Sequence, residues 1–129
     1  AFDKKISFDL ESSDMTELLK NSDFVSLHVP AQKSYVIGKN EFNLMKTGAG
    51  LINAARGGVV DEKSLIESLD SGKLAFAGVD TFENEPKPSV KLLMHPKVSL
   101  TPHIGAATNE AQDRIGIELA NQIMTLVKE

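Results

Sequence analysis

Three ionisable side chains, Arg56, Glu85 and His103, have types and surroundings that suit chemistry on a small acid. Arg56 follows an apolar run and precedes two glycines, so we expect its guanidinium at the carboxyl end of a buried strand. Ligands of open α/β sheets bind at that end. A buried guanidinium requires an anion, and a substrate carboxylate can accept from it at two points. An equally weighted alternative is a protein carboxylate that braces the loop.

His103 follows a short predicted strand, with Pro102 before it and Gly105 two residues after it. Histidine titrates near neutrality, which suits a general acid or base. Proline stiffens the approach, and glycine lets a ligand come close to the backbone. For a single histidine, a loop side chain bonded to backbone is the commoner alternative.

Two carboxylates accompany this histidine. Glu85 follows the predicted strand that ends at Asp80. A carboxylate beside an imidazole fixes its tautomer, although a solvated loop acid is the usual role of glutamate. Asp80 ends an apolar run, where a charge must find a donor, either a backbone amide or a ligand amide.

One reaction would use all three groups together. Arg56 would hold and polarise a 2-oxo acid, and Glu85 would support His103. His103 would protonate the carbonyl oxygen as a hydride arrives, or take the hydroxyl proton in the reverse direction. The hydride must come from a cofactor, because no side chain supplies one.

The chain alternates short apolar runs with amphipathic stretches. Runs typical of strands are residues 5–10, 24–29, 50–53, 74–80 and 98–100. Stretches typical of helices begin at Ser13 or Asp14, at residue 39, at Asp61 and at residue 109, the last running to 128 with the apolar stripe Ile115, Leu119 and Ile123. Strands separated by helices predict an α/β fold with a parallel sheet.

The carboxyl ends of parallel strands share one edge of the sheet. The predicted strands end at His28, at residues 53–56, at Asp80 and at residues 101–103. We therefore expect these polar groups to converge on one crevice, as in a functional site.

The composition limits the classes of function. The 129 residues suit one domain, and the net charge of −4 argues against non-specific nucleic-acid binding. The chain has no cysteine, which excludes a disulfide framework and thiolate metal sites; we expect no metal and a cytoplasmic location. No apolar run approaches the roughly 20 residues of a membrane span.

Four segments carry a resemblance to a known family. Residues 22–30, 53–61, 78–86 and 100–112 resemble the D-isomer-specific 2-hydroxyacid dehydrogenases, in the family's order and across almost the whole chain. The run from His103 to Gln112 most resembles the phosphoglycerate dehydrogenase branch.

The resemblance implies a role for each matching residue. It makes Arg56 the substrate-binding arginine, Glu85 the partner of the histidine, and His103 the catalytic acid or base. Glutamate in place of glutamine at position 85 favours a 2-hydroxy acid over formate. The implied cofactor is NAD, and the positions that match its contacts are Asp3, His28, Pro30, Ala54, Ala55, Arg56, Asp80, His103, Gly105 and Ala106.

Some features of that family are missing from the sequence. The Gly-x-Gly-x-x-Gly fingerprint is absent, so we expect a Rossmann-like domain over residues 1–129 without the first strand, its glycine-rich loop or the substrate domain. Asp3 matches the acid that binds the adenosine ribose and selects NAD, but Lys4 and Lys5 leave NADP open. Loss of the first strand would expose a sheet edge, which predicts a homo-oligomer.

The resemblance therefore implies part of an NAD-dependent oxidoreductase acting on a small 2-hydroxy or 2-oxo acid, with 3-phosphoglycerate and phosphohydroxypyruvate of serine biosynthesis as the expected pair. The isolated chain should have little activity without a pyrophosphate cradle. An NAD-sensing, corepressor-like assembly module with the same three residues is an alternative from another class. A packing module without a ligand is a third.

Overall fold

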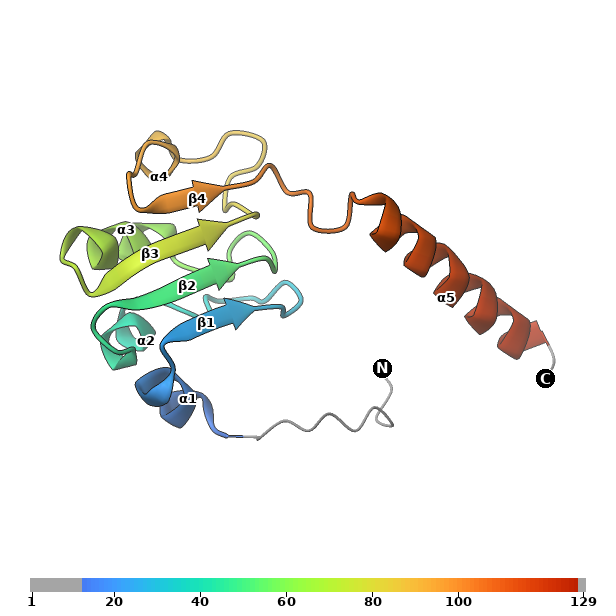
Figure 1. The fold of residues 1–129 in the computed structure, drawn as a ribbon, viewed down its shortest axis with the longest axis horizontal. Helices are drawn as coiled ribbons and strands as arrows, with labels where there is room; N and C mark the ends of the chain where they lie inside the picture. The colour runs from blue at the N-terminus through green and yellow to red at the C-terminus, as the bar shows by residue number, and fades with distance from the viewer. Residues whose placement is uncertain (1–12, 128–129) are drawn as a thin grey trace.

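A computed structural model of the chain describes residues 13–127. Its centre is a parallel four-stranded sheet in the order β1-β2-β3-β4 (Figure 1). The strands are β1 (Phe24–Leu27), β2 (Ala49–Asn53), β3 (Leu74–Val79) and β4 (Val98–Leu100). The parallel α/β prediction is confirmed, and β1 stands at an edge of this sheet. The strand predicted at residues 5–10 lies outside the described residues.

Helices join the strands as the alternating pattern predicts. They are α1 (Met15–Asn21), α2 (Lys39–Leu44), α3 (Glu62–Asp70), α4 (Val90–Leu93) and α5 (Asn109–Val127). Asp14 caps α1 by accepting from the backbone N–H of Glu17 at 2.9 Å. Asp61 caps α3 in the same way, and Gly72 follows that helix with φ 76°. The single turn α4 is too short for its periodicity to be visible in the sequence.

In residues 13–127, the core lies on one face of the sheet. Inward-facing residues of the strands pack against helices α1 to α4, and the largest fully buried side chains include Leu19, Phe42, Leu51, Leu65 and Leu74. The prediction of a buried strand over residues 24–29 is wrong in two respects. The strand ends at Leu27, and burial alternates along it, leaving Phe24 69% exposed. In the described part of the chain, no element covers the face of Phe24, Ile52 and Phe76.

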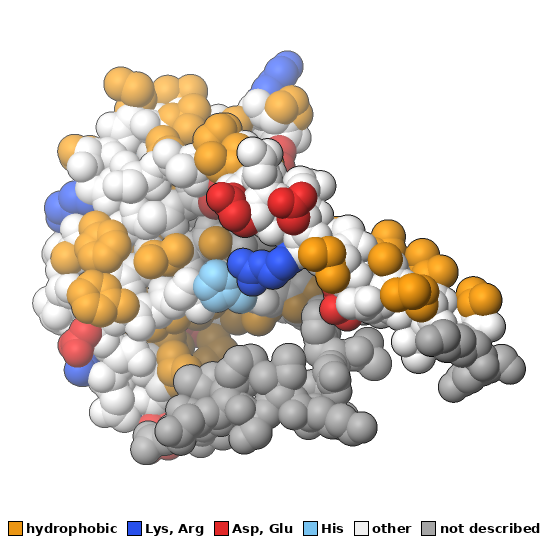
Figure 2. All heavy atoms as spheres, turned by 45° about the vertical axis from the view of Figure 1, so that its right-hand side comes forward, with side chains coloured by type: hydrophobic (Ala, Val, Ile, Leu, Met, Phe, Trp, Pro, Cys, Tyr) orange, Lys and Arg blue, Asp and Glu red, His pale blue; other side chains and the backbone are white. Residues whose placement is uncertain are grey.

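Helix α5 projects away from the sheet (Figure 1). None of its described residues is buried, and the stripe of Ile115, Leu119 and Ile123 faces solvent. Figure 2 shows apolar side chains along this projecting helix. Within residues 13–127, no helix is both long enough and apolar enough to cross a membrane.

Candidate functional site

The carboxyl ends of the strands gather the predicted residues around three hollows. The first, of about 310 Å³, is lined by residues that follow β1 and β2: His28, Val29, Pro30, Ala54, Ala55 and Arg56. The second, of about 430 Å³, has Ala54 in common with the first and adds Asp80, Thr101 and Gly105. The third, of about 240 Å³, lies between Glu85 and His103. Segments from all four strand ends therefore meet at one edge of the sheet.

The turn after β2 sets the direction of Arg56. The buried side chain of Asn53 accepts from the backbone N–H of Ala55 at 3.2 Å, which folds the chain back on itself. Arg56 is exposed, contrary to the expectation of a buried group, because it lies in the turn that follows β2 and not in the strand itself. Its Nη1 donates to the carbonyl of Ala55 at 2.6 Å. Among residues 13–127, Arg56 forms no ion pair, so the guanidinium is open to an external anion.

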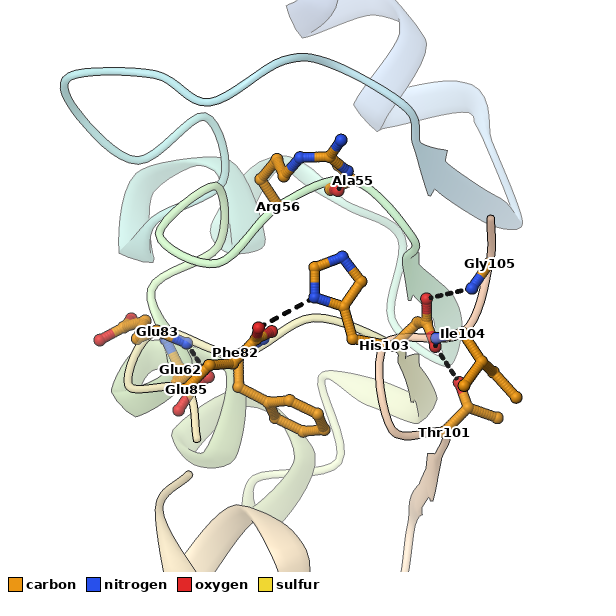
Figure 3. A network of polar contacts seen from close by, with 11 residues as sticks. Ala55, Arg56, Glu62, Phe82, Glu83, Glu85, Thr101, His103, Ile104 and Gly105 are labelled. Carbon is orange, nitrogen blue, oxygen red and sulfur yellow. Dashed lines mark hydrogen bonds and ion pairs between the residues drawn. The ribbon is translucent and has the colours of Figure 1, made fainter. Parts of the chain in front are cut away.

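His103 and Glu85 form a direct pair. The Nδ1 atom of His103 lies 2.9 Å from Oε2 of Glu85, whose Oε1 accepts from the backbone N–H of Phe82 at 2.9 Å. Figure 3 shows the imidazole between Glu85 and the segment of Arg56. The hydrogen bond from His103, followed by that from Phe82, lowers the pKa of Glu85 below its ordinary value. An ionised carboxylate only accepts, so Nδ1 carries the proton and Nε2 is left for a ligand.

The backbone of His103 lies in the left-handed region, with φ 56°. A residue with a side chain adopts this conformation at a cost of about 1–2 kcal/mol. The carboxylate of Asp80 holds the strained loop in place. It accepts from Thr101 Oγ1 at 2.6 Å, from the backbone N–H of Ile104 at 2.9 Å and from that of Gly105 at 3.1 Å. Strain of this kind persists where the surroundings fix the backbone, which is common at functional sites.

The same bonds decide the ionisation of Asp80. Burial alone would raise its pKa, but the bonds from Thr101, Ile104 and Gly105 outweigh burial and hold the pKa below its ordinary value. Asp80 is therefore ionised at neutral pH, and it finds its donors inside the chain. Its Oδ2 atom accepts only the Gly105 N–H among the described residues, so it can accept from one more donor.

The hollow beside Asp80 fits the nicotinamide end of a dinucleotide. Its walls are mostly apolar, from Ile52, Val79 and Leu100, and suit a flat ring. The carboxylate of Asp80 offers the acceptor that a carboxamide NH₂ requires. Ala54 stands between this hollow and that of Arg56, so its small side chain leaves both open.

Two predicted cofactor positions form hydrogen bonds within the chain. The carbonyl of Ala106 accepts from Gln112 Nε2 at 2.6 Å, which ties the loop to the start of α5. His28 is exposed and bonds to Ser26 Oγ through Nε2 at 2.8 Å. Asp3 lies outside the described residues.

Sequence reasoning missed a pair of glutamates behind the site. Glu62 begins α3 and Glu83 lies in the loop after β3, and each carboxylate accepts from the backbone N–H of the other residue. It also missed Thr101 as a donor to Asp80. The one signal for Thr101 was its place as a polar residue directly after a predicted strand. No local pattern indicates the glutamate pair.

Comparisons with known proteins identify the family of the chain. The family model described as "D-isomer specific 2-hydroxyacid dehydrogenase, NAD binding domain" matches residues 3–105. The chain is 47% identical over 119 residues to a hydroxypyruvate reductase of Thermotoga maritima, covering 88% of this chain and 39% of that protein. It is 44% identical over 117 residues to a D-3-phosphoglycerate dehydrogenase of Methanocaldococcus jannaschii, covering 89% of this chain and 22% of that protein.

A solved structure shows the same fold. A glyoxylate reductase from Paecilomyes thermophila superposes with a TM-score of 0.79 at 37% identity, over 91% of this chain and 36% of that one. The chain thus spans less than half the length of each of these relatives. The parallel sheet, the paired Glu85 and His103, and the family match over residues 3–105 lead to one conclusion: the chain belongs to the D-isomer specific 2-hydroxyacid dehydrogenase family, in its NAD-binding domain.

Proposed function

We propose that this chain contributes the nicotinamide site and the acid–base machinery of an oxidoreductase that interconverts a 2-hydroxy acid and a 2-oxo acid. The observation that carries the proposal is the bond of 2.9 Å between His103 and an ionised Glu85, in a loop that Asp80 holds. A histidine fixed in this way has one nitrogen directed away from its partner and free to exchange a proton with a ligand.

Each side chain would have one role. NAD, when bound, supplies or accepts the hydride. Arg56 would bind the substrate carboxylate through its exposed guanidinium. His103 Nε2 would give a proton to the carbonyl oxygen during reduction, and take the hydroxyl proton during oxidation. Glu85 would hold the Nδ1 proton and stabilise the imidazolium form.

The substrate belongs to the small 2-hydroxy and 2-oxo acids. Within this class we propose 3-phosphoglycerate and phosphohydroxypyruvate, because residues 103–112 resemble the phosphoglycerate dehydrogenase branch. Relatives named for hydroxypyruvate and glyoxylate reduction match to a similar degree, so these two acids are the direct competitors. We further propose that the protein acts in the cytoplasm as a homo-oligomer and that the isolated chain turns over little substrate.

Binding of a 2-oxo acid analogue tests this function without requiring turnover. Oxamate should perturb the NMR signals of Arg56 and His103 in the NADH-loaded chain. Arg56→Lys should weaken oxamate binding by about tenfold or more, because an ammonium cannot donate two parallel bonds to a carboxylate. Arg114→Lys, the matched change on exposed α5, should not alter it. Equal binding by both variants would remove Arg56 from substrate recognition.

A further inference from the structure

Two glutamates join the loops that carry Arg56 and Glu85. Glu83 Oε1 accepts from the backbone N–H of Glu62 at 2.9 Å, and Glu62 Oε1 accepts from the backbone N–H of Glu83 at 2.8 Å. Figure 3 shows this pair on the Glu85 side of the site. We call the two residues with their reciprocal bonds the glutamate clasp.

The clasp connects the start of α3 to the loop after β3. Glu62 is only 8% exposed, and the clasp brings a second carboxylate, that of Glu83, to its backbone N–H. Burial, together with the nearby negative charge of Glu83, raises the pKa of Glu62, although the backbone bond opposes the shift. A pair of apolar side chains would fill this position without a desolvation cost. The clasp therefore supplies directional bonds, which an apolar contact cannot supply.

Those bonds act directly beside the reacting groups. Glu83 stands two residues before Glu85, and Glu62 begins the helix that follows the Arg56 turn. The two loops also touch: a Cβ atom built on Gly57 would lie 1.9 Å from the carbonyl oxygen of Phe82. The backbone N–H of Phe82 in turn donates to Glu85. A shift of the Glu83 backbone would thus move Phe82 and the carboxylate that holds His103.

We propose that Glu62 and Glu83 are positioning residues, and that their clasp sets the place of the Glu85–His103 pair relative to Arg56. The inference rests on the proposed function for its significance. We place the clasp outside direct contact with substrate and cofactor, with its effect passing through Phe82 and Glu85.

The pKa of Glu85 distinguishes a positioning role of Glu83 from a direct effect of its negative charge. Glu83→Ala removes the acceptor, loosens the Phe82–Glu85 bond and should raise the pKa of Glu85 toward that of an exposed glutamate. Loss of the Glu83 charge acts in the opposite direction, since a nearby negative charge raises the pKa of a carboxyl group. A rise therefore reports lost positioning. Glu83→Gln keeps an acceptor oxygen and should leave the pKa of Glu85 near the wild-type value or below it.

The measurement is a ¹³C NMR titration of the Glu85 carboxyl carbon in the 129-residue chain. Asn84→Ala, an exposed neighbour in the same loop, is the control and should not alter the titration. Glu83→Asp keeps the negative charge but has a side chain too short to reach the backbone N–H of Glu62. If Glu83→Ala does not fold, a rise in the pKa of Glu85 in the Glu83→Asp chain supports the proposal instead. A folded Glu83→Ala or Glu83→Asp chain with an unchanged pKa of Glu85 would overturn the proposal. An equal rise in the pKa of Glu85 in the Glu83→Gln and Glu83→Ala chains would also overturn it.

This titration needs neither NADH nor an oxo acid. Failure of oxamate to bind would therefore overturn the proposed function while leaving the clasp intact. An unchanged Glu85 titration with normal oxamate binding would overturn the clasp alone.

Discussion

At the residue scale, His103 and Glu85 affect each other's ionisation through their direct hydrogen bond. His103→Ala removes the strongest contribution to the low pKa of Glu85, so that pKa should rise toward the ordinary value of glutamate. The same ¹³C titration of the Glu85 carboxyl carbon measures it. His28→Ala, on the loop after β1, serves as the control for loss of a histidine. An unshifted pKa in the His103→Ala chain would mean that the pair does not persist in solution.

Asp80 leads to a prediction about the dependence of the loop on pH. Its folded pKa is lowered, so the stability from its bonds is fully present above the unfolded value of about 3.9 and disappears as pH falls through the lower folded value. The amide signals of Ile104 and Gly105 should therefore show an acid transition below about pH 4. Asp80→Asn should abolish this acid transition, whereas Asp23→Asn should retain it. The same acid transition in the Asp80→Asn chain would contradict the assignment.

Residue chemistry was the part of the site most visible in the sequence. Polar residues that follow apolar runs are conspicuous in a sequence, and four of them were predicted: Arg56, Asp80, Glu85 and His103. The structure places all four at one edge of the sheet. Their environments were less predictable. The exposure of Arg56 depends on how the turn after β2 directs the side chain, and a local pattern does not encode that direction.

At the element scale, the contact of the Arg56 turn with the loop after β3 requires a glycine. A methyl group at residue 57 would overlap the backbone of Phe82, and backbone cannot move aside as a side chain can. Gly57→Ala should lower the free energy of unfolding by about 1–3 kcal/mol, as overpacking does. Urea denaturation measures the change. Gly78→Ala is the matched control, because its Cβ would meet Ile52 at an ordinary 3.7 Å. Equal stability of both variants would show that the two loops do not pack as described.

Strands β2, β3 and β4 were predictable to within a residue because glycine, aspartate or a polar run bounds each apolar stretch. β1 was predicted too long because His28 and Val29 continue an apolar-rich pattern that the ladder does not follow. The glutamate clasp was not predictable at all. It joins residues 21 apart, and no local pattern encodes how two loops face each other.

At the scale of the whole molecule, the described residues leave one sheet face and the stripe of α5 open to water. Phe24 and Phe76 lie side by side on that face, with ring centroids 6.0 Å apart. Apolar surface of this kind favours contact between chains, as does the edge of β1, which no strand within residues 13–127 pairs. We predict an apparent mass that rises with concentration in sedimentation velocity. Phe24→Lys with Phe76→Lys should reduce the association, and Met94→Lys, exposed near α4, should not. A single monomeric species at all concentrations would contradict the prediction.

The most direct test of the whole account is a titration of NADH into this chain, followed by nicotinamide fluorescence. We predict saturable binding at micromolar to low-millimolar concentrations, because Asp80 and the His103 loop are already assembled. Asp80→Ala should abolish that binding, and Asp113→Ala, on exposed α5, should preserve it. No saturable binding by the wild-type chain, or equal binding by the Asp80→Ala chain, would contradict a nicotinamide site at this edge of the sheet.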